Sequence, residues 1–203
     1  MGRPSTARAR LLDSALELMH ASNYGAASVD DLCAAAHVKK GSFYHFFPSK
    51  RDLALAVLDR QWALARAHVL EPAFAADVPP LERITRCFRR AAEVQRRPVV
   101  LGCPFGNLAG ELGTLDTGIR DTIRAIFEGY RAYFARAIVE AVAAGSIAPL
   151  DVAAATEALL AYFQGALLLA KTCNDAEVIE RLAERAVSLV LRSTIVDRSV
   201  HKA

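Results

Sequence analysis

The sequence predicts an all-α protein, and two observations support that prediction. Apolar residues recur at three- and four-residue spacing along nearly the whole chain, and alternating strand-like runs bounded by turn residues are absent. The 203 residues are 53% hydrophobic and 23% charged, so the chain is able to bury a full core. Proline and glycine divide it into about nine helices. Residues 1–50 form one predicted domain and residues 51–203 a second, joined through the fourth helix.

The two N-terminal helices carry clear start and stop signals. One is expected over about 5–21 and ends at the Asn-Tyr-Gly break at 23–25. The next is expected over about 28–37, because the Ser28 hydroxyl and the Asp31 carboxylate three residues later match a capping box.

A third helix is expected over 39–47, where a proline stops it. A fourth spans about 49–69, with Ser49 and Asp52 forming a second capping box, and Pro72 and a later Pro-Pro pair mark a boundary after it. The remaining helices are expected near 80–96, 104–112, 116–144, 150–173 and 175–193.

The segment 38–50, Val-Lys-Lys-Gly-Ser-Phe-Tyr-His-Phe-Phe-Pro-Ser-Lys, carries the clearest functional signal. At 100° per residue its three phenylalanines share one face, which is typical of a core stripe. The other faces display small and polar groups that permit close backbone approach or bond phosphates and base edges, namely Gly41, Ser42, Tyr44 and His45. Lysines that suit flanking phosphates lie at both ends of the segment, namely Lys39, Lys40 and Lys50. A short capped helix followed by such a surface fits a helix-turn-helix, whose second helix enters the major groove.

The charge distribution agrees with this interpretation. Residues 1–51 hold seven Lys and Arg against four Asp and Glu, a net charge of +3 that equals the net charge of the whole chain. The remaining residues are neutral overall. Positive charge confined to one quarter of a chain indicates a polyanionic partner for that quarter.

Several other classes are disfavoured. The N-terminus lacks the apolar region of a secretory signal, and no run reaches the roughly 18 uncharged apolar residues of a membrane helix. We therefore expect a cytoplasmic protein with no membrane partner. The four cysteines form no C-x-x-C pair, the histidines show no metal spacing, and no phosphate loop or Ser/His/Asp group is present. No catalytic residue, metal or cofactor is expected. An enzyme or carrier using a helical cavity, and a sequence-nonspecific DNA-binding protein, remain as alternatives.

The stretch from about Ala7 to Leu58 resembles the TetR family of transcriptional repressors, most closely in Lys-Gly-Ser-Phe-Tyr-His-Phe-Phe-Pro-Ser-Lys-Arg-Asp-Leu at 40–53. The resemblance implies an N-terminal three-helix domain containing the helix-turn-helix and a C-terminal helical domain for ligand binding and dimerisation. It also implies a homodimer that binds a double-stranded operator with an inverted repeat and is released by a small-molecule inducer. The residues expected to contact DNA are Arg3, Ser28, Lys39, Lys40, Gly41, Ser42, Tyr44, His45 and Lys50. Asp30 departs from the family, since it stands where some members present a base-reading side chain.

The segment 102–113 departs from its surroundings, with four glycines and a proline around Cys103 and Asn107. Such a stretch is expected to break or kink a helix and to aim the thiol and the amide inward. It resembles the corresponding segment of a TetR subset that includes NemR-like and LmrA/YxaF-like repressors, some of which sense electrophiles or oxidants with a cysteine. For Cys103 two interpretations stay open, passive packing or lining of a pocket and covalent sensing by a thiolate.

The ligand pocket is expected to be apolar and to suit a neutral or weakly polar small molecule. Its expected lining residues are Phe88, Cys103, Phe105, Asn107, Phe127, Tyr130, Phe134, Tyr162, Phe163 and Gln164. The last two helices, about 151–172 and 175–192, offer more apolar surface than one protomer is able to hide. A symmetric four-helix interface would bury that surface in a homodimer.

Overall fold

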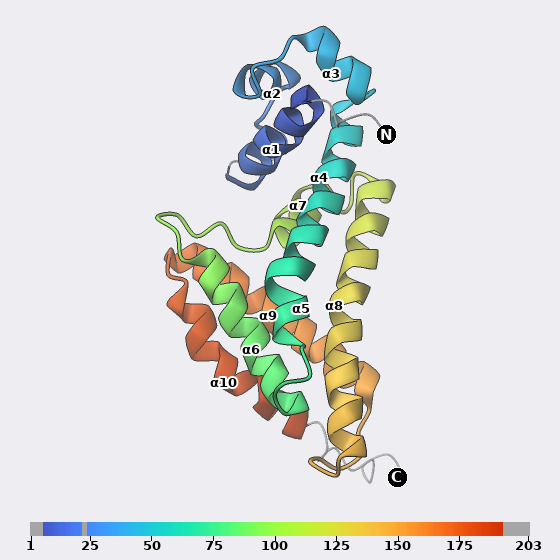
Figure 1. The fold of residues 1–203 in the computed structure, drawn as a ribbon, viewed down its shortest axis with the longest axis vertical. Helices are drawn as coiled ribbons and strands as arrows, with labels where there is room; N and C mark the ends of the chain where they lie inside the picture. Colours follow the sequence, from blue (N-terminus) through green and yellow to red (C-terminus); the bar gives the residue numbers. More distant parts are fainter. Residues whose placement is uncertain (1–5, 22–23, 193–203) are drawn as a thin grey trace, which may run out of the picture. The chain divides into compact units, whose positions relative to one another are not determined.

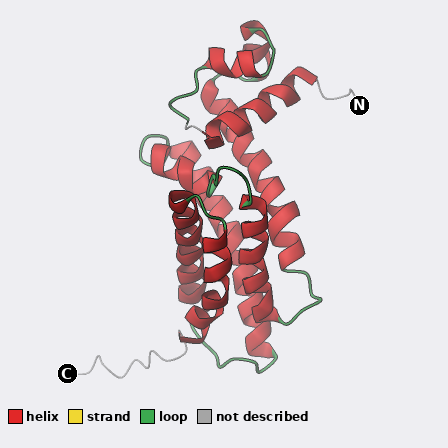
Figure 2. Cartoon of the chain, turned by 90° about the vertical axis from the view of Figure 1, so that its left-hand side faces the viewer, coloured by secondary structure: helices red, strands yellow, loops and turns green. Residues whose placement is uncertain are grey.

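The computed structural model describes residues 6–21 and 24–192, and every regular element in this part of the chain is a helix (Figures 1 and 2). The all-α prediction is confirmed. The helices are α1 (Thr6–Ala21), α2 (Val29–Ala35), α3 (Lys40–Phe46), α4 (Lys50–Ala65), a π-helical segment (Arg66–Leu70), α5 (Glu71–Ala73), α6 (Pro80–Gln95), α7 (Pro104–Leu112), α8 (Thr117–Ala143), α9 (Val152–Cys173) and α10 (Glu177–Arg192).

The chain forms two compact units. The first holds the residues up to Leu64 together with Pro104–Arg124, and the second holds Ala65–Cys103 together with the residues from Ala125 onward. This division differs from the predicted boundary at residue 50. The physical reason is that α4 and the segment 104–124 pack and bond with the N-terminal helices.

In the first unit, helices α1 to α4 enclose a small core. Its fully buried members come from all four helices and include Leu11, Leu32, Phe43 and Leu53. The predicted capping box at the start of α2 is confirmed, because the Asp31 N–H donates to Ser28 Oγ at 3.1 Å and the Ser28 N–H donates to Asp31 Oδ2 at 2.9 Å. Capping fixes where α2 begins.

The fourth helix runs past its predicted end. α4 passes directly into the π-helical segment and then into α5, so Pro72 does not mark the expected boundary. Pro72 lies in the first turn of α5, where the missing N–H of proline is tolerated. Just before it, the π-helical segment changes the backbone hydrogen bonding. The Glu71 N–H donates to the Arg66 carbonyl five residues earlier, one residue further than in an α-helix.

The glycines inside the segment 102–113 do not interrupt α7, contrary to the expected kink. The breaks lie on either side of that helix. Gly102 has a φ of 71°, in the left-handed region that favours glycine, and Gly113 follows α7 with its N–H bonded to the Ala109 carbonyl at 2.9 Å. The special backbone geometry therefore comes just before Cys103, whereas the helix that follows is regular.

In the second unit, α6 and α10 pack against each other and are joined by ion pairs along their length. Arg89 pairs with Glu180 at 3.3 Å, and Arg96 pairs with Glu177 at 2.9 Å. The fully buried side chains of this unit include Phe88 on α6, Phe134 on α8 and Phe163 on α9.

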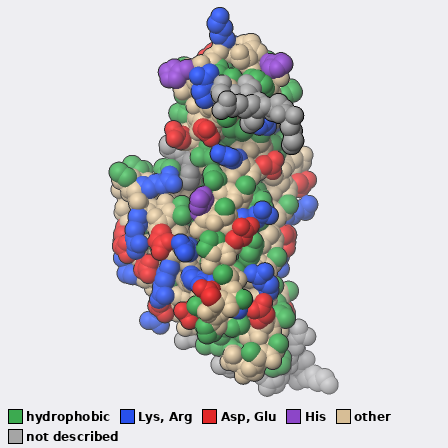
Figure 3. All heavy atoms as spheres, viewed as in Figure 1, with side chains coloured by type: hydrophobic (Ala, Val, Ile, Leu, Met, Phe, Trp, Pro, Cys, Tyr) green, Lys and Arg blue, Asp and Glu red, His purple; other side chains and the backbone are tan. Residues whose placement is uncertain are grey.

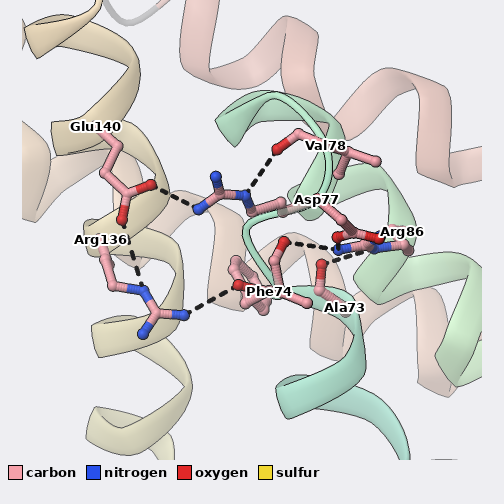
Figure 4. A network of polar contacts seen from close by, with 9 residues as sticks. Ala73, Phe74, Asp77, Val78, Arg86, Arg136 and Glu140 are labelled. Carbon is pink, nitrogen blue, oxygen red and sulfur yellow. Dashed lines mark hydrogen bonds and ion pairs between the residues drawn. The ribbon is translucent and has the colours of Figure 1, made fainter.

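Arginines of α6 and α8 hold the loop between α5 and α6 (Figure 4). Arg86 Nε donates to the Ala73 carbonyl at 2.8 Å, and Arg136 donates to the Phe74 carbonyl at 3.2 Å. Arg83 Nε donates to the Val78 carbonyl at 3.0 Å. The Ala73 and Phe74 carbonyls lie at the C-terminal end of α5, where carbonyls lack intrahelical partners and cationic side chains satisfy them and complement the helix dipole.

Replacing Arg83 with alanine should destabilise the second unit. The Arg83 side chain is only 8% exposed and pairs with Glu140 at 2.6 Å. Removing one partner of a buried pair typically costs about 3 kcal/mol, and we expect at least about 2 kcal/mol here, measured by denaturant unfolding, because Glu140 keeps partial access to water. Arg120→Ala, which removes an exposed arginine of α8, is the control. Equal stability of the two variants would contradict this account of the loop.

Candidate nucleic-acid interface and sensor region

Helix α3 exposes the face that the sequence analysis predicts. Phe43 and Phe47 are buried, and Phe46 is partly buried against the same core. Gly41, His45 and Tyr44 are exposed, Tyr44 to 51%. The Tyr44 ring meets Phe43 edge-on at 5.2 Å between ring centroids, so a buried ring supports the exposed phenol.

The other residues predicted to contact DNA differ in their surroundings. Lys39 and Lys40 are exposed, and Ser42 is partly exposed on the flank of α3. Ser28 is exposed, but its hydroxyl donates to Asp31 Oδ2 at 2.6 Å as part of the capping box. Arg3 lies outside the described residues. Figure 3 shows Lys, Arg and His side chains on the surface over α2 and α3.

Lys50 is held by the turn between α1 and α2. Its Nζ donates to the Tyr24 carbonyl and lies 4.1 Å from the centroid of the Tyr24 ring. Partial burial lowers the pKa of Lys50, while the nearby Glu111 and Asp31 carboxylates act in the opposite direction. The ammonium thus tethers this turn to the start of α4.

Two carboxylates from the segment 104–124 complete this arrangement, and the sequence analysis missed both. Glu111 Oε2 accepts the Tyr24 N–H at 2.8 Å, and Glu111 Oε1 accepts the Gly25 N–H at 2.5 Å. A Cβ at Gly25 would lie 3.0 Å from Glu111 Oε1, so this close approach favours glycine. Glu111 is the only charged residue between 102 and 113, and that isolation is the signal that sequence reasoning overlooked.

Asp116 is the second carboxylate. Arg51 of α4 binds it through two nitrogens, with Nε 2.6 Å from Oδ2 and an Nη atom 3.1 Å from Oδ1. The Arg51 guanidinium lowers the pKa of this carboxyl, assisted by the Ile119 N–H, which donates to Oδ1 at 3.0 Å. Asp116 therefore binds α4 and caps the first turn of α8 at the same time.

Five of the residues predicted to line a ligand pocket meet in the second unit. The ring of Phe163 lies 4.9 Å from Phe88, 5.8 Å from Tyr130 and 6.3 Å from Phe134. Tyr162 packs on Phe88 at 5.8 Å, and its hydroxyl donates to the Leu182 carbonyl of α10. This aromatic cluster consists of Phe88, Tyr130, Phe134, Tyr162 and Phe163.

The remaining predicted pocket residues are more dispersed. Phe105 and Asn107 belong to the first unit, where the Phe105 ring packs on Trp62 at 6.5 Å. Phe127 is partly exposed on α8. Gln164 directly follows Phe163, and its Nε2 is buried without a hydrogen-bond partner in the described part of the chain. An unsatisfied buried donor is uncommon and suits a bound acceptor.

Cys103 is buried, with 7% of its surface exposed. It contributes to raising the pKa of Tyr130, an effect in which burial of the phenol is the larger cause. A Cβ placed on the preceding Gly102 would lie 3.2 Å from Cβ and Cδ of Lys171, so the stem of this lysine passes over the backbone next to Cys103. Within residues 6–21 and 24–192, no group of three or more His, Cys, Asp and Glu is placed to hold a metal ion.

Comparison with known proteins identifies both halves of the chain. Residues 11–57 match the model of the tetR family of bacterial regulatory proteins, and residues 80–186 match the model of the tetracyclin repressor-like C-terminal domain. The transcriptional regulator AcuR of Cereibacter sphaeroides is 35% identical over 180 residues, which cover 84% of this chain and 81% of AcuR. The transcriptional repressor DhaR of a Mycobacterium species is 30% identical over 191 residues, which cover 92% of this chain and 93% of DhaR.

A solved structure gives the same result. The regulatory protein TetR from Rhodobacter sphaeroides matches with a TM-score of 0.82 at 31% identity, over 91% of this chain and 99% of that protein. The narrower likeness to NemR-like and LmrA/YxaF-like repressors stays a prediction. Both domain models and relatives that cover most of the chain agree that it belongs to the TetR family of bacterial transcriptional regulators.

Proposed function

We propose that this protein is a homodimeric cytoplasmic repressor that binds an inverted-repeat operator through α3 of each protomer. A small, neutral or weakly polar ligand in the C-terminal unit releases it from DNA. The observation that carries the proposal is the exposed surface of α3, where Tyr44 packs edge-on against buried Phe43 and His45 packs edge-on against partly buried Phe46. Exposed hydrogen-bonding groups on a helix anchored by aromatic core residues suit readout of a major groove.

Dimerisation through α9 and α10 is supported by apolar surface that one protomer leaves uncovered. By length and composition alone, α9 is the one helix among the described residues that could span a membrane, yet only 33% of its most apolar stretch is buried. Leu168 is 62% exposed and Leu169 is 52% exposed. In a DNA-binding regulator, a second copy of the same surface is the natural cover for this face, and a twofold dimer presents two reading helices to an inverted repeat.

Ligand binding is supported by the aromatic cluster around Phe163 and by the buried Nε2 of Gln164, the next residue along α9, which has no hydrogen-bond partner among the described residues. Aromatic side chains with few polar groups suit a small apolar molecule, and Gln164 Nε2 would donate to a ligand oxygen. The test is a thermal-shift screen with small neutral compounds, followed by operator binding with each compound that stabilises the protein. Because coupling is reciprocal, an inducer must bind the free protein more tightly than the operator complex. Equal affinity for the two forms would overturn ligand release.

Within the first unit, the segment 104–124 is placed to influence the DNA-binding helices, because Glu111 holds the turn between α1 and α2 and Asp116 holds Arg51. Replacing Glu111 with alanine should free the N–H groups of Tyr24 and Gly25. Hydrogen bonds to a charged group contribute roughly 1.5–3 kcal/mol, so we expect amide exchange at these residues to accelerate at least about tenfold. The affinity of the Glu111→Ala variant for the operator should also fall.

Hydrogen-exchange mass spectrometry of peptides covering residues 24–25 measures this effect. Glu128→Ala, which removes an exposed carboxylate of α8, is the matched control and should leave exchange in this turn unchanged. Unchanged exchange in Glu111→Ala would mean that Glu111 does not restrain the turn in solution.

Covalent sensing at Cys103 is the second candidate, and it requires a thiolate, which a nearby cation would promote. The aliphatic stem of Lys171 lies beside Gly102, the residue before Cys103. The burial of Cys103 opposes reaction, so we expect N-ethylmaleimide to leave operator binding unchanged in a Cys173→Ser background, which removes an exposed thiol. Loss of operator binding that the additional Cys103→Ser change prevents would instead establish covalent sensing.

A further inference from the structure

Asp30 and Lys40 form an ion pair between α2 and α3. Lys40 Nζ lies 2.8 Å from Oδ1 and 3.0 Å from Oδ2 of Asp30, so the ammonium bridges both carboxylate oxygens. This hydrogen bond raises the pKa of Lys40. The orientation of a long, otherwise mobile side chain is thereby fixed by a residue of the neighbouring helix.

The two residues relate differently to the ends of their own helices. The capping box of α2 uses Ser28 and Asp31, which leaves the Asp30 carboxylate for another role. Lys40 is the first residue of α3, where a cation is unfavourable because the helix dipole is positive at that end. Helix formation therefore favours the Asp30 carboxylate, which lies in the first turn of α2, but it does not account for a lysine at the start of α3.

Stability does not account for the pair either. The Asp30 side chain is 71% exposed and that of Lys40 is 54% exposed. Ion pairs this accessible to water contribute little to the stability of the fold. A carboxylate on a DNA-binding surface also repels phosphates, so Asp30 lowers DNA affinity unless it meets a hydrogen-bond donor. In the major groove the donors are the amino groups N4 of cytosine and N6 of adenine.

The geometry of the pair matches one base pair best. Asp30 presents an acceptor and Lys40 a donor about 3 Å apart, and a C·G pair presents the cytosine N4 donor beside the guanine O6 acceptor. Guanine adds N7 as a second acceptor, and the ammonium has three N–H groups to share between Asp30 and guanine. Thymine would place a methyl group and an acceptor against the carboxylate. An A·T pair carries one acceptor on each base, adenine N7 and thymine O4, so it does not offer Lys40 two neighbouring acceptors on the base opposite the amino group.

The geometry points to Asp30 as a specificity-determining residue that, with Lys40, reads one C·G base pair in each half-site of the operator. This assignment rests on the proposed operator binding. Asp30 selects cytosine through N4 and holds the Lys40 ammonium toward the guanine of the same pair.

The test is selection of bound sequences from a randomised DNA library by the full chain, in parallel with Asp30→Asn and Lys40→Gln. Asp13→Asn, which removes a similarly exposed carboxylate from α1, is the matched control. The wild type and the control should enrich the same inverted repeat with one C·G pair fixed in each half-site. Both test variants should lose the preference at that pair and keep the others. For Asp30→Asn, discrimination against T·A there should fall about tenfold.

Three results would overturn the assignment: an unchanged motif in Asp30→Asn, an equal loss of preference at every position, or an A·T pair at the affected position. Thermal unfolding separates a folding defect from a loss of readout, and Lys40→Gln provides an independent variant should Asp30→Asn unfold. If the wild type enriches no motif, the proposed operator binding fails as well. If it enriches a motif that the variants share, only the role of Asp30 fails.

Discussion

Replacing Tyr44 with alanine is expected to lower operator affinity roughly a hundredfold or more without unfolding the protein. Loss of one specific contact costs about 1–3 kcal/mol, and the change removes one contact from each protomer of a dimer. The side chain is 51% exposed, so its loss should change the free energy of unfolding by less than about 1 kcal/mol. Fluorescence anisotropy with a labelled operator and denaturant unfolding measure the two quantities.

Two control variants distinguish a lost DNA contact from a loss of packing or folding. Tyr44→Phe keeps the ring against Phe43 and removes only the hydroxyl, so it separates hydrogen bonding from packing. Phe43→Ala truncates a fully buried ring and should cost roughly 3–5 kcal/mol of stability. Were Tyr44→Ala to unfold the protein as Phe43→Ala does, the exposed face of α3 would be a structural surface and not a reading surface.

Replacing Leu168 and Leu169 together with glutamate is expected to dissociate the proposed dimer. Burying a leucine contributes about 1.5–3 kcal/mol, and a twofold interface contains each residue twice. The dimer dissociation constant should therefore rise at least about a thousandfold, and affinity for an inverted repeat should fall with it. Sedimentation velocity measures the association state, and the anisotropy assay measures DNA binding.

Val99→Glu is the matched control for this change. Val99 is 61% exposed and lies outside α9 and α10, so the substitution introduces a glutamate at a similarly exposed apolar position. It should leave the dimer intact. Monomers in the control as well as in the double variant, or dimers in both, would contradict an interface built on Leu168 and Leu169.

The fold was predictable because its signals are local. Apolar spacing and capping residues lie within a few positions of the structure they cause, so the Ser28 capping box and the bounds 104–112 of α7 follow from the sequence. Pro72 misled the prediction because proline marks a helix boundary only on average. Here the preceding π turns and the first-turn position accommodate it, which no local pattern reveals.

The site was predictable only in part. The exposed face of α3 follows from helical periodicity around three phenylalanines. The roles of Glu111 and Asp116 depend on partners more than 60 residues away in the chain, and spacing says nothing of such contacts. Lys50 illustrates the same limit, since its charge predicts a phosphate contact whereas the structure places its ammonium on the Tyr24 carbonyl.

The central claim, specific dimeric operator binding through α3, is tested most directly by selecting fragments of the source genome with purified protein at near-physiological salt. A Tyr44→Ala, His45→Ala double variant serves as the control, because both side chains are exposed. We expect the wild type alone to enrich fragments that share an inverted repeat. No enriched sequence, or equal enrichment by both proteins, would contradict reading of DNA by α3.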